Sequence, residues 1–171
     1  NEYTLHNHSG NLGIYCMGPT LEILKVKPNM NCVEMVAGFF LHDIGKSGTP
    51  REILDKCGTL TPIEWKFIKR HPEEGCLLLR KFGALTREAE IIVSQHHERC
   101  NGAGYPRRLN GQDIHLYAKI CALGDTFDAL TSRRPYRNAC SSFDALKIMR
   151  DELSREFDPV LFSLFVKLFR K

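Results

Sequence analysis

The spacing of apolar residues limits the fold of this chain more than any other feature. Apolar residues recur at three- and four-residue steps in most segments, and strand-like alternation is nowhere sustained. One such segment contains Val33, Val36, Phe39, Phe40 and Ile44. It predicts a buried helix that ends near Gly45 and carries His42 and Asp43 on its last turn. The pattern therefore predicts an all-α protein.

Local start and stop signals place a further helix. Thr61-Pro62-Ile63-Glu64 combines an N-cap threonine, a proline at the first helical position and a glutamate at the third. A helix is expected from there to about Arg70. Pro72 disfavours α geometry at the residue before it, so a break or kink is expected at His71.

The remaining segments continue the helical pattern. Thr86 can cap a helix that leads to His96, while Ser141 and Asp158 can start two C-terminal helices. A helix with small residues on one face, typical of close helix packing, contains Ala118, Cys121, Ala122, Asp125, Ala129 and Leu130. The glycines of residues 101–106 exclude regular structure there. No repeat or linker divides the chain, so a single helical bundle over residues 1–171 is expected.

Imidazole and carboxylate side chains occur at the ends or on the faces of at least four of these helices. They are His8, His42, His71, His96 and His97, with Asp43 and Asp125. A helical bundle can direct ligands from several helices into one interior, and this mixture suits iron, manganese, nickel or zinc better than calcium. Any one of these histidines, taken alone, is more simply a surface or core residue. Asp43 and Lys46 follow an apolar helix, where charges are costly unless they are paired or bind a metal.

The chain resembles the HD-GYP family of metal-dependent phosphohydrolases in a series of blocks that cover about its whole length. The blocks are His8-Ser-Gly-Asn-Leu12, His42-Asp-Ile-Gly-Lys46, Pro50, Ile53-Leu54, Leu60-Thr61, His71-Pro72, His96-His97-Glu98-Arg99, Gly102-x-Gly-Tyr-Pro106, Asp125-Thr-Phe-Asp128-Ala-Leu-Thr131 and Arg134-Pro-Tyr-Arg137. A glycine-tyrosine-proline motif alone would be a weak signal. Many blocks in order at family-like spacing make a strong one.

The resemblance implies a helical bundle of the HD-domain type with a two-metal centre. One metal would take His8, His42 and Asp125, the other His71, His96 and His97, and Asp43 would bridge them. Iron or manganese is expected, with nickel or zinc as alternatives. A hydroxide shared by the metals would attack cyclic di-GMP, giving the linear dinucleotide pGpG, with further cleavage to GMP left open.

Substrate contacts are expected near this centre. Lys46 lies one turn after Asp43, so its ammonium can reach a phosphate oxygen, although a lysine there would also satisfy the end of a helix. The resemblance places further substrate contacts at Asp128, Arg134 and Arg137, against the simpler interpretation of solvated surface charge. The role of Arg107 and Arg108 stays open.

The chain departs from the family in two places. Asn101 stands where the family usually has an aspartate, which removes a charge but keeps a good turn former. The loop Gly102–Pro106 is either structural or, by resemblance, a contact for partner proteins such as a diguanylate cyclase. Thr4 stands where some members have a glutamate that binds a third metal. Glu2 lies six residues before His8, on the wrong side of a helix, and His6 lies between them as a spare candidate ligand. Two metals are therefore expected.

Composition narrows the function classes. The net charge of +4 comes without a long basic block, so a nucleic-acid binder that uses Arg107, Arg108 and Arg133 with Arg134 is disfavoured. No apolar run is long enough to cross a bilayer, and seven scattered cysteines fit a reducing cytoplasm. The domain is expected to contact neither nucleic acid polymers nor membranes, although the parent protein could be attached to one.

Three functions remain. The first is hydrolysis of cyclic di-GMP, and the second is hydrolysis of another cyclic dinucleotide. The third is a catalytically weak module that binds nucleotides or partner proteins. The chain starts without Met, and members of the family commonly follow sensor or receiver domains, so the output end of a longer bacterial regulator is expected.

Overall fold

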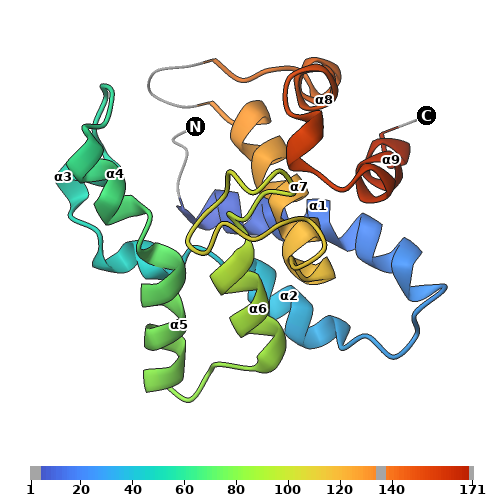
Figure 1. Ribbon diagram of the computed structural model, residues 1–171, viewed down its shortest axis with the longest axis horizontal. Coiled ribbons are helices and arrows are strands. Elements are labelled where there is room, and N and C mark those ends of the chain that lie inside the picture. Colours follow the sequence, from blue (N-terminus) through green and yellow to red (C-terminus); the bar gives the residue numbers. More distant parts are fainter. Residues whose placement is uncertain (1–4, 134–137, 170–171) are drawn as a thin grey trace.

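The chain folds into helices joined by loops, as expected (Figure 1). The computed structural model describes residues 5–133 and 138–169, which contain one isolated β-bridge, Asn101 to Asn110, and no strand. The elements are α1 (Leu5–Leu24), α2 (Cys32–Leu41), the 3₁₀ helix η1 (Ile44–Gly48), α3 (Arg51–Leu54), α4 (Pro62–Ile68), α5 (His71–Lys81), α6 (Arg87–Gln95), α7 (Leu116–Thr131), α8 (Ser142–Asp151), the 3₁₀ helix η2 (Ser154–Glu156) and α9 (Pro159–Lys167). No helix in this part of the chain has the length and apolar character needed to span a membrane.

Side-chain caps start the helices where the sequence indicates. Thr61 and Glu64 form the predicted capping box at the start of α4, with Pro62 in its first turn. The side chain of Thr86 accepts a hydrogen bond from the backbone of α6. Ser141 and Asp158 act in the same way at α8 and α9. These starts depend only on neighbouring residues, which is why the sequence predicts them.

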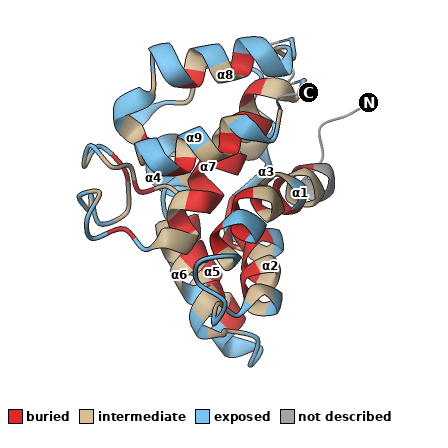
Figure 2. Ribbon diagram, turned by 90° about the vertical axis from the view of Figure 1, so that its right-hand side faces the viewer, coloured by how far each residue is buried: buried red, intermediate tan, exposed pale blue. Residues whose placement is uncertain are grey.

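Helix α7 is the centre of the bundle. It packs against α1, α6, α8 and α9 (Figure 1), and most of its residues are buried (Figure 2). Phe127 of α7 contacts Phe165 of α9, with ring centroids 5.4 Å apart. The predicted close packing occurs at Gly124, where an added Cβ atom would lie 2.8 Å from Sγ of Cys16 on α1. The small residues Gly124 and Cys16 face each other and thus allow α1 and α7 to pack closely.

The buried face of α2 differs from the predicted one. Val33 is 78% exposed and Phe40 46% exposed, whereas Met35, Phe39 and His42 are fully buried. The segment is apolar on several sides, so its spacing fits more than one face, and packing against α1 and α6 decides between them. The helix also ends at Leu41, before the predicted end. The observed face directs His42 inward.

The predicted break before His71 is present. Helix α4 ends at Ile68, and α5 begins at His71 with Pro72 in its first turn. The start of α5 packs closely on η1, because Gly45 has no side chain. A Cβ atom on Gly45 would lie 2.0 Å from the carbonyl oxygen of His71. This contact holds η1, which follows Asp43, against the helix that presents His71.

Candidate metal centre

All seven predicted ligands lie together in the interior of the bundle. Helix α1 presents His8, the end of α2 presents His42 and Asp43, the start of α5 presents His71, the end of α6 presents His96 and His97, and α7 presents Asp125. His8, His42, Asp43, His71 and His96 are buried. Residues from five helices therefore meet at one point, as the sequence indicates.

The side chains form two groups that share Asp43. One group contains His8 and His42, and the other contains His71, His96 and His97. Oδ2 of Asp43 lies 3.4 Å from Nε2 of His42 and 3.6 Å from Nε2 of His8. Its Oδ1 atom lies 3.2 Å from Nε2 of His71 and 3.7 Å from Nε2 of His96. Each carboxylate oxygen thus faces a different group.

Asp125 also lies between the two groups. Its Oδ1 atom is 3.3 Å from Nε2 of His8, and its Oδ2 atom is 3.8 Å from Nδ1 of His97. Burial by itself raises the pKa of a carboxyl, but the hydrogen bond with His8 and the other histidines nearby outweigh it and hold the pKa of Asp125 well below its ordinary value. Burial also raises the pKa of Asp43, but the charges of His42 and Lys46 outweigh it and hold this pKa well below its ordinary value, so both carboxylates of the centre are ionised.

Backbone carbonyls fix the tautomers of three histidines. The Nδ1 atoms of His42, His71 and His96 lie 2.8, 2.7 and 2.9 Å from the carbonyl oxygens of Phe39, Ile68 and Val93. A carbonyl oxygen only accepts hydrogen bonds, so each Nδ1 carries a proton and donates it. In a neutral imidazole, Nε2 then has a free lone pair and is available as a metal ligand.

The resulting contact between His71 and His96 fits a site for a cation. Their Nε2 atoms lie 3.1 Å apart. Burial lowers the pKa of both side chains, that of His71 to about 3 with a further contribution from His96, so both are neutral and neither Nε2 can donate. The adjacent Oδ1 atom of Asp43 is buried and has no hydrogen-bond donor. The lone pairs of the two Nε2 atoms and the ionised Oδ1 atom of Asp43 thus point at one another without a hydrogen-bond donor between them. Such a set of acceptors fits a divalent cation.

The His8 group fits a cation for a different reason. Burial opposes a charge on His8, but hydrogen bonds to Asp125 and Asp128 outweigh it and raise its pKa to about 9. Nε2 of His8 lies 3.1 Å from Nε2 of His42. Without a metal, a proton on Nε2 of His8 supplies the positive charge that the surrounding acceptors require. A metal ion can supply the same charge, so the donors of both groups fit metal binding.

The structure places Asp128 differently from the prediction that it contacts substrate. Its side chain is fully buried. Oδ2 lies 2.7 Å from Nδ1 of His8, while Oδ1 accepts hydrogen bonds from Asn11 at 2.9 Å and Ser132 at 3.1 Å. Both oxygens thus have partners within the protein, and the side chain does not reach solvent. Asp128 instead orients the ring of His8, a role that depends on a contact between distant segments and has no local signal in the sequence.

Of the other predicted substrate residues, Lys46 lies within the described part of the chain. Nζ of Lys46 lies 2.5 Å from Oδ2 of Asp43, and the lysine side chain is 23% exposed. It thus reaches the centre, as its three-residue spacing from Asp43 predicts, and keeps access to solvent. Arg134 and Arg137 lie outside the described residues, as do Glu2 and Thr4.

The loop after His97 is held by a buried glutamate that the sequence analysis assigned no role. Glu98 is 1% exposed and accepts hydrogen bonds from the backbone nitrogens of Arg107 at 2.7 Å and Leu109 at 2.9 Å. An acidic residue three positions before the glycine-rich loop that starts at Asn101 was the available signal. Tyr105 stacks on His97, with ring centroids 4.6 Å apart.

Asn101 keeps the turn that the sequence predicts at this position. Its side-chain oxygen accepts a hydrogen bond from the nitrogen of Ala103 at 3.0 Å, and Gly102 adopts a φ of 74°. The loop therefore closes without the aspartate that the family usually has. The glycine-tyrosine-proline motif within it forms one wall beside the second histidine group.

Known proteins are similar to this chain in sequence. A family model described as HD domain matches residues 20–161. The chain is 39% identical over 127 residues to a cyclic di-GMP phosphodiesterase of Pseudomonas aeruginosa, covering 74% of this chain and 30% of that protein. It is 42% identical over 130 residues to 3'3'-cGAMP-specific phosphodiesterase 3 of Vibrio cholerae, covering 74% of this chain and 27% of that protein.

A solved structure shares the fold. It is a protein from Bdellovibrio bacteriovorus described as HDG"Y"P, with a TM-score of 0.78 and 18% sequence identity over 98% of this chain and 53% of that one. The matched part of this chain spans about a third or less of the two curated relatives' length.

Proposed function

This chain belongs to the HD domain family, as its resemblance to HD-GYP proteins indicates, and from that premise we propose that it is a metal-dependent phosphodiesterase for cyclic dinucleotides. The observation that carries the proposal is the position of Asp43, whose two carboxylate oxygens face two separate groups of histidines. Such a carboxylate is suited to bridge a pair of metals, and paired metals are common in phosphodiester hydrolysis.

The proposed ligand sets follow the two groups. His8, His42 and Asp125 hold one metal, and His71, His96 and His97 hold the other, with Asp43 between them. Iron or manganese is favoured for this mixture of imidazole and carboxylate, and nickel or zinc are the alternatives. Asp125 lies close enough to His97 to orient the second group as well. The count of two metals is part of the proposal.

The metals, when bound, would supply Lewis acidity to a phosphoryl oxygen and make water a nucleophile at neutral pH. The chain's own residues position the reaction. Asp128 holds the ring of His8, and backbone carbonyls hold those of His42, His71 and His96. We assign to Lys46, whose ammonium lies beside Asp43, a contact with a phosphate oxygen. Arg134 and Arg137 are assigned further contacts to phosphate or guanine, on the strength of their forked donors.

Cyclic di-GMP is the first substrate we propose, with pGpG as product and GMP as a further one. Water adds to phosphorus, the bond from phosphorus to the ribose 3' oxygen breaks, and that oxygen takes up a proton. Relatives named for cyclic di-GMP and for 3'3'-cGAMP have similar identity, which supports the substrate class more than either base.

The setting of the domain belongs to the same proposal. We propose one HD-GYP domain over residues 1–171 that acts as the output domain of a longer bacterial signalling protein, since the relatives are longer than the matched segment. A cytoplasmic location is supported by seven cysteines that form no disulfide. Contact of the Gly102–Pro106 loop with a diguanylate cyclase is a weaker part of the proposal.

The test is chromatography of cyclic di-GMP and 3'3'-cGAMP after incubation with protein purified anaerobically with iron or manganese. Asp43→Ala, which removes the shared carboxylate, is the control. We expect a linear dinucleotide from the parent protein and none from the variant. Bound metal without any product would direct the search to other phosphodiesters. Neither metal nor product would favour the weak binding module over an enzyme.

A further inference from the structure

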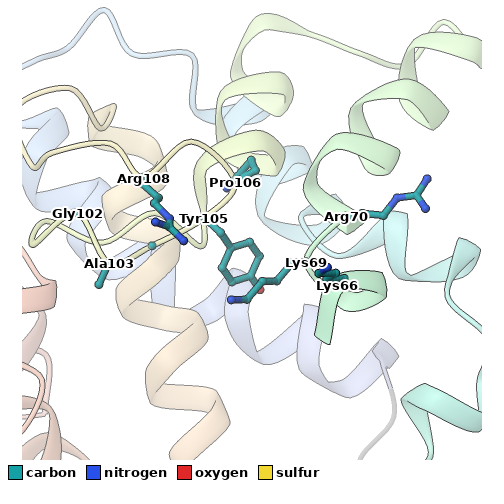
Figure 3. Close-up of a pocket in the computed structure, with 9 residues that line it drawn as sticks. Lys66, Lys69, Arg70, Gly102, Ala103, Tyr105, Pro106 and Arg108 are labelled. Carbon is teal, nitrogen blue, oxygen red and sulfur yellow. The ribbon is translucent and has the colours of Figure 1, made fainter. Parts of the chain in front are cut away.

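A groove extends outward from the second histidine group, between α4 and the loop of residues 102–108. Its volume is about 630 Å³, within the range of small-molecule sites. Lys66, Lys69, Tyr105 and Arg108 line it (Figure 3). The adjoining hollow shares Lys66, Lys69 and Tyr105 and reaches His97. The groove and the metal centre are thus connected.

The groove carries positive charge that the protein does not neutralise. Among the residues that the structure describes, Lys66, Lys69 and Arg108 make no ion pair with a carboxylate, and all three are exposed. Nearby cations differ in this respect. Arg70 also lines the groove, but its charge is paired with Glu74 at 3.1 Å. Three unpaired cations around one hollow attract an anion.

Aromatic rings accompany these charges. Trp65 is 44% exposed. The ammonium of Lys69 lies 5.8 Å from the centroid of Trp65 and 5.4 Å from that of Tyr105, and Figure 3 shows Lys69 extending along the tyrosine ring. Flat rings beside cations are the usual means by which proteins hold a nucleobase and its phosphate together.

The backbone at Arg108 adds an independent observation. Its φ is 55°, the left-handed region that a non-glycine residue seldom adopts. Glycine would take this conformation more easily. A strained residue that projects a guanidinium into a cationic groove is typical of a binding position.

We propose that this groove binds the second nucleotide of the substrate, the one whose phosphodiester is not being cleaved. A cyclic dinucleotide has two phosphates and two bases, and only one phosphate can lie at the metals. Lys66, Lys69 and Arg108 bind the other phosphate, and Trp65 and Tyr105 contact its base. The inference rests on the proposed function and adds a site for the part of the substrate that does not react.

Trp65 makes the test direct, because it is the only tryptophan in the chain. Its fluorescence is measured by rapid mixing of the metal-loaded protein with cyclic di-GMP, before turnover. We expect a saturable change in emission. In Lys66→Ala/Lys69→Ala/Arg108→Gly, the Kd from this signal rises at least about tenfold, the loss expected for one charge-assisted hydrogen bond. Arg70→Ala is the matched control, because it removes a lining charge that Glu74 already neutralises, and it should change the Kd by no more than about twofold.

Steady-state kinetics give the second readout. The triple variant raises the KM for cyclic di-GMP by a much larger factor than the KM for bis(p-nitrophenyl) phosphate, which has one phosphate and no base. Circular dichroism checks its fold. If the fluorescence change and KM are the same in the variant and the parent, the groove does not bind substrate, whatever the activity. If the parent hydrolyses nothing but its fluorescence responds and the triple variant does not, the groove inference stands and the proposed function fails.

Discussion

Nδ1 of His8 lies 2.7 Å from Oδ2 of Asp128, a contact between two buried side chains that are 120 residues apart in the sequence. The carboxylate fixes the imidazole tautomer with its proton on Nδ1, which leaves Nε2 directed at Asp43 and Asp125. Carboxylates that orient a metal-binding histidine in this way make it a stronger ligand. Helices α1 and α7 therefore both determine the position of Nε2 of His8.

Replacement of Asp128 tests this role. We predict that Asp128→Ala weakens metal binding by about 10- to 100-fold, because the ring of His8 loses the group that orients it. Affinity is measured by competition with a metallochromic chelator. Ser132→Ala, which removes a weaker partner of the same carboxylate, is the control and changes affinity much less. Equal affinity in Asp128→Ala and the parent would show that His8 needs no such support.

The contact between η1 and α5 allows a matched pair of glycine substitutions. Gly45→Ala places a Cβ atom 2.0 Å from the backbone oxygen of His71, so the two segments must separate. We predict a loss of about 3 kcal/mol or more in the free energy of unfolding. Gly10→Ala meets no atom within 4 Å inside helix α1 and should be neutral or stabilise the protein by up to about 1 kcal/mol. Urea unfolding measures both, and similar values for the two would contradict the close contact.

The histidines give the chelator-treated protein a stability maximum near neutral pH. The pKa of His71 is lowered to about 3 in the folded protein. As the pH decreases below 6.5, the ordinary pKa of histidine, the unfolded chain takes up a proton that the folded protein does not, so the free energy of unfolding decreases. The pKa of His8 is raised to about 9, so its contribution is fully present below pH 6.5 and is lost as the pH rises through 9. Urea midpoints between pH 4 and 10 would show this maximum. A curve that stays flat from pH 7 to 4 would contradict it, and His71→Gln should reduce the loss on the acid side.

The sequence predicts the elements of this fold whose causes are local. The capping box at Thr61 and the caps at Thr86, Ser141 and Asp158 each depend on residues within one turn, and all four are present. These starts need no knowledge of how distant segments meet. The meeting of the seven predicted ligands does depend on distant contacts, because they lie on five helices, and it was expected from the resemblance to a known family.

Features that depend on distant contacts were not predicted correctly. The buried face of α2 is set by α1 and α6, so the apolar spacing alone put Val33 on the wrong side. The resemblance implied a substrate contact for Asp128, and its contacts with His8 and Asn11 on α1 could not be predicted from the sequence. The groove beside Tyr105 requires α4 to lie next to a loop about 40 residues later in the chain. The sequence contains these residues but does not indicate that they meet.

The number of metal ions bound per chain tests the central claim most directly. After anaerobic loading with manganese and gel filtration, elemental analysis should find about two ions in the parent protein. His8→Ala should retain about one, because the group of His71, His96 and His97 is intact, and Asp43→Ala should lose most of both. Three ions at high occupancy in the parent, or two retained in Asp43→Ala, would contradict a two-metal centre built on the shared carboxylate.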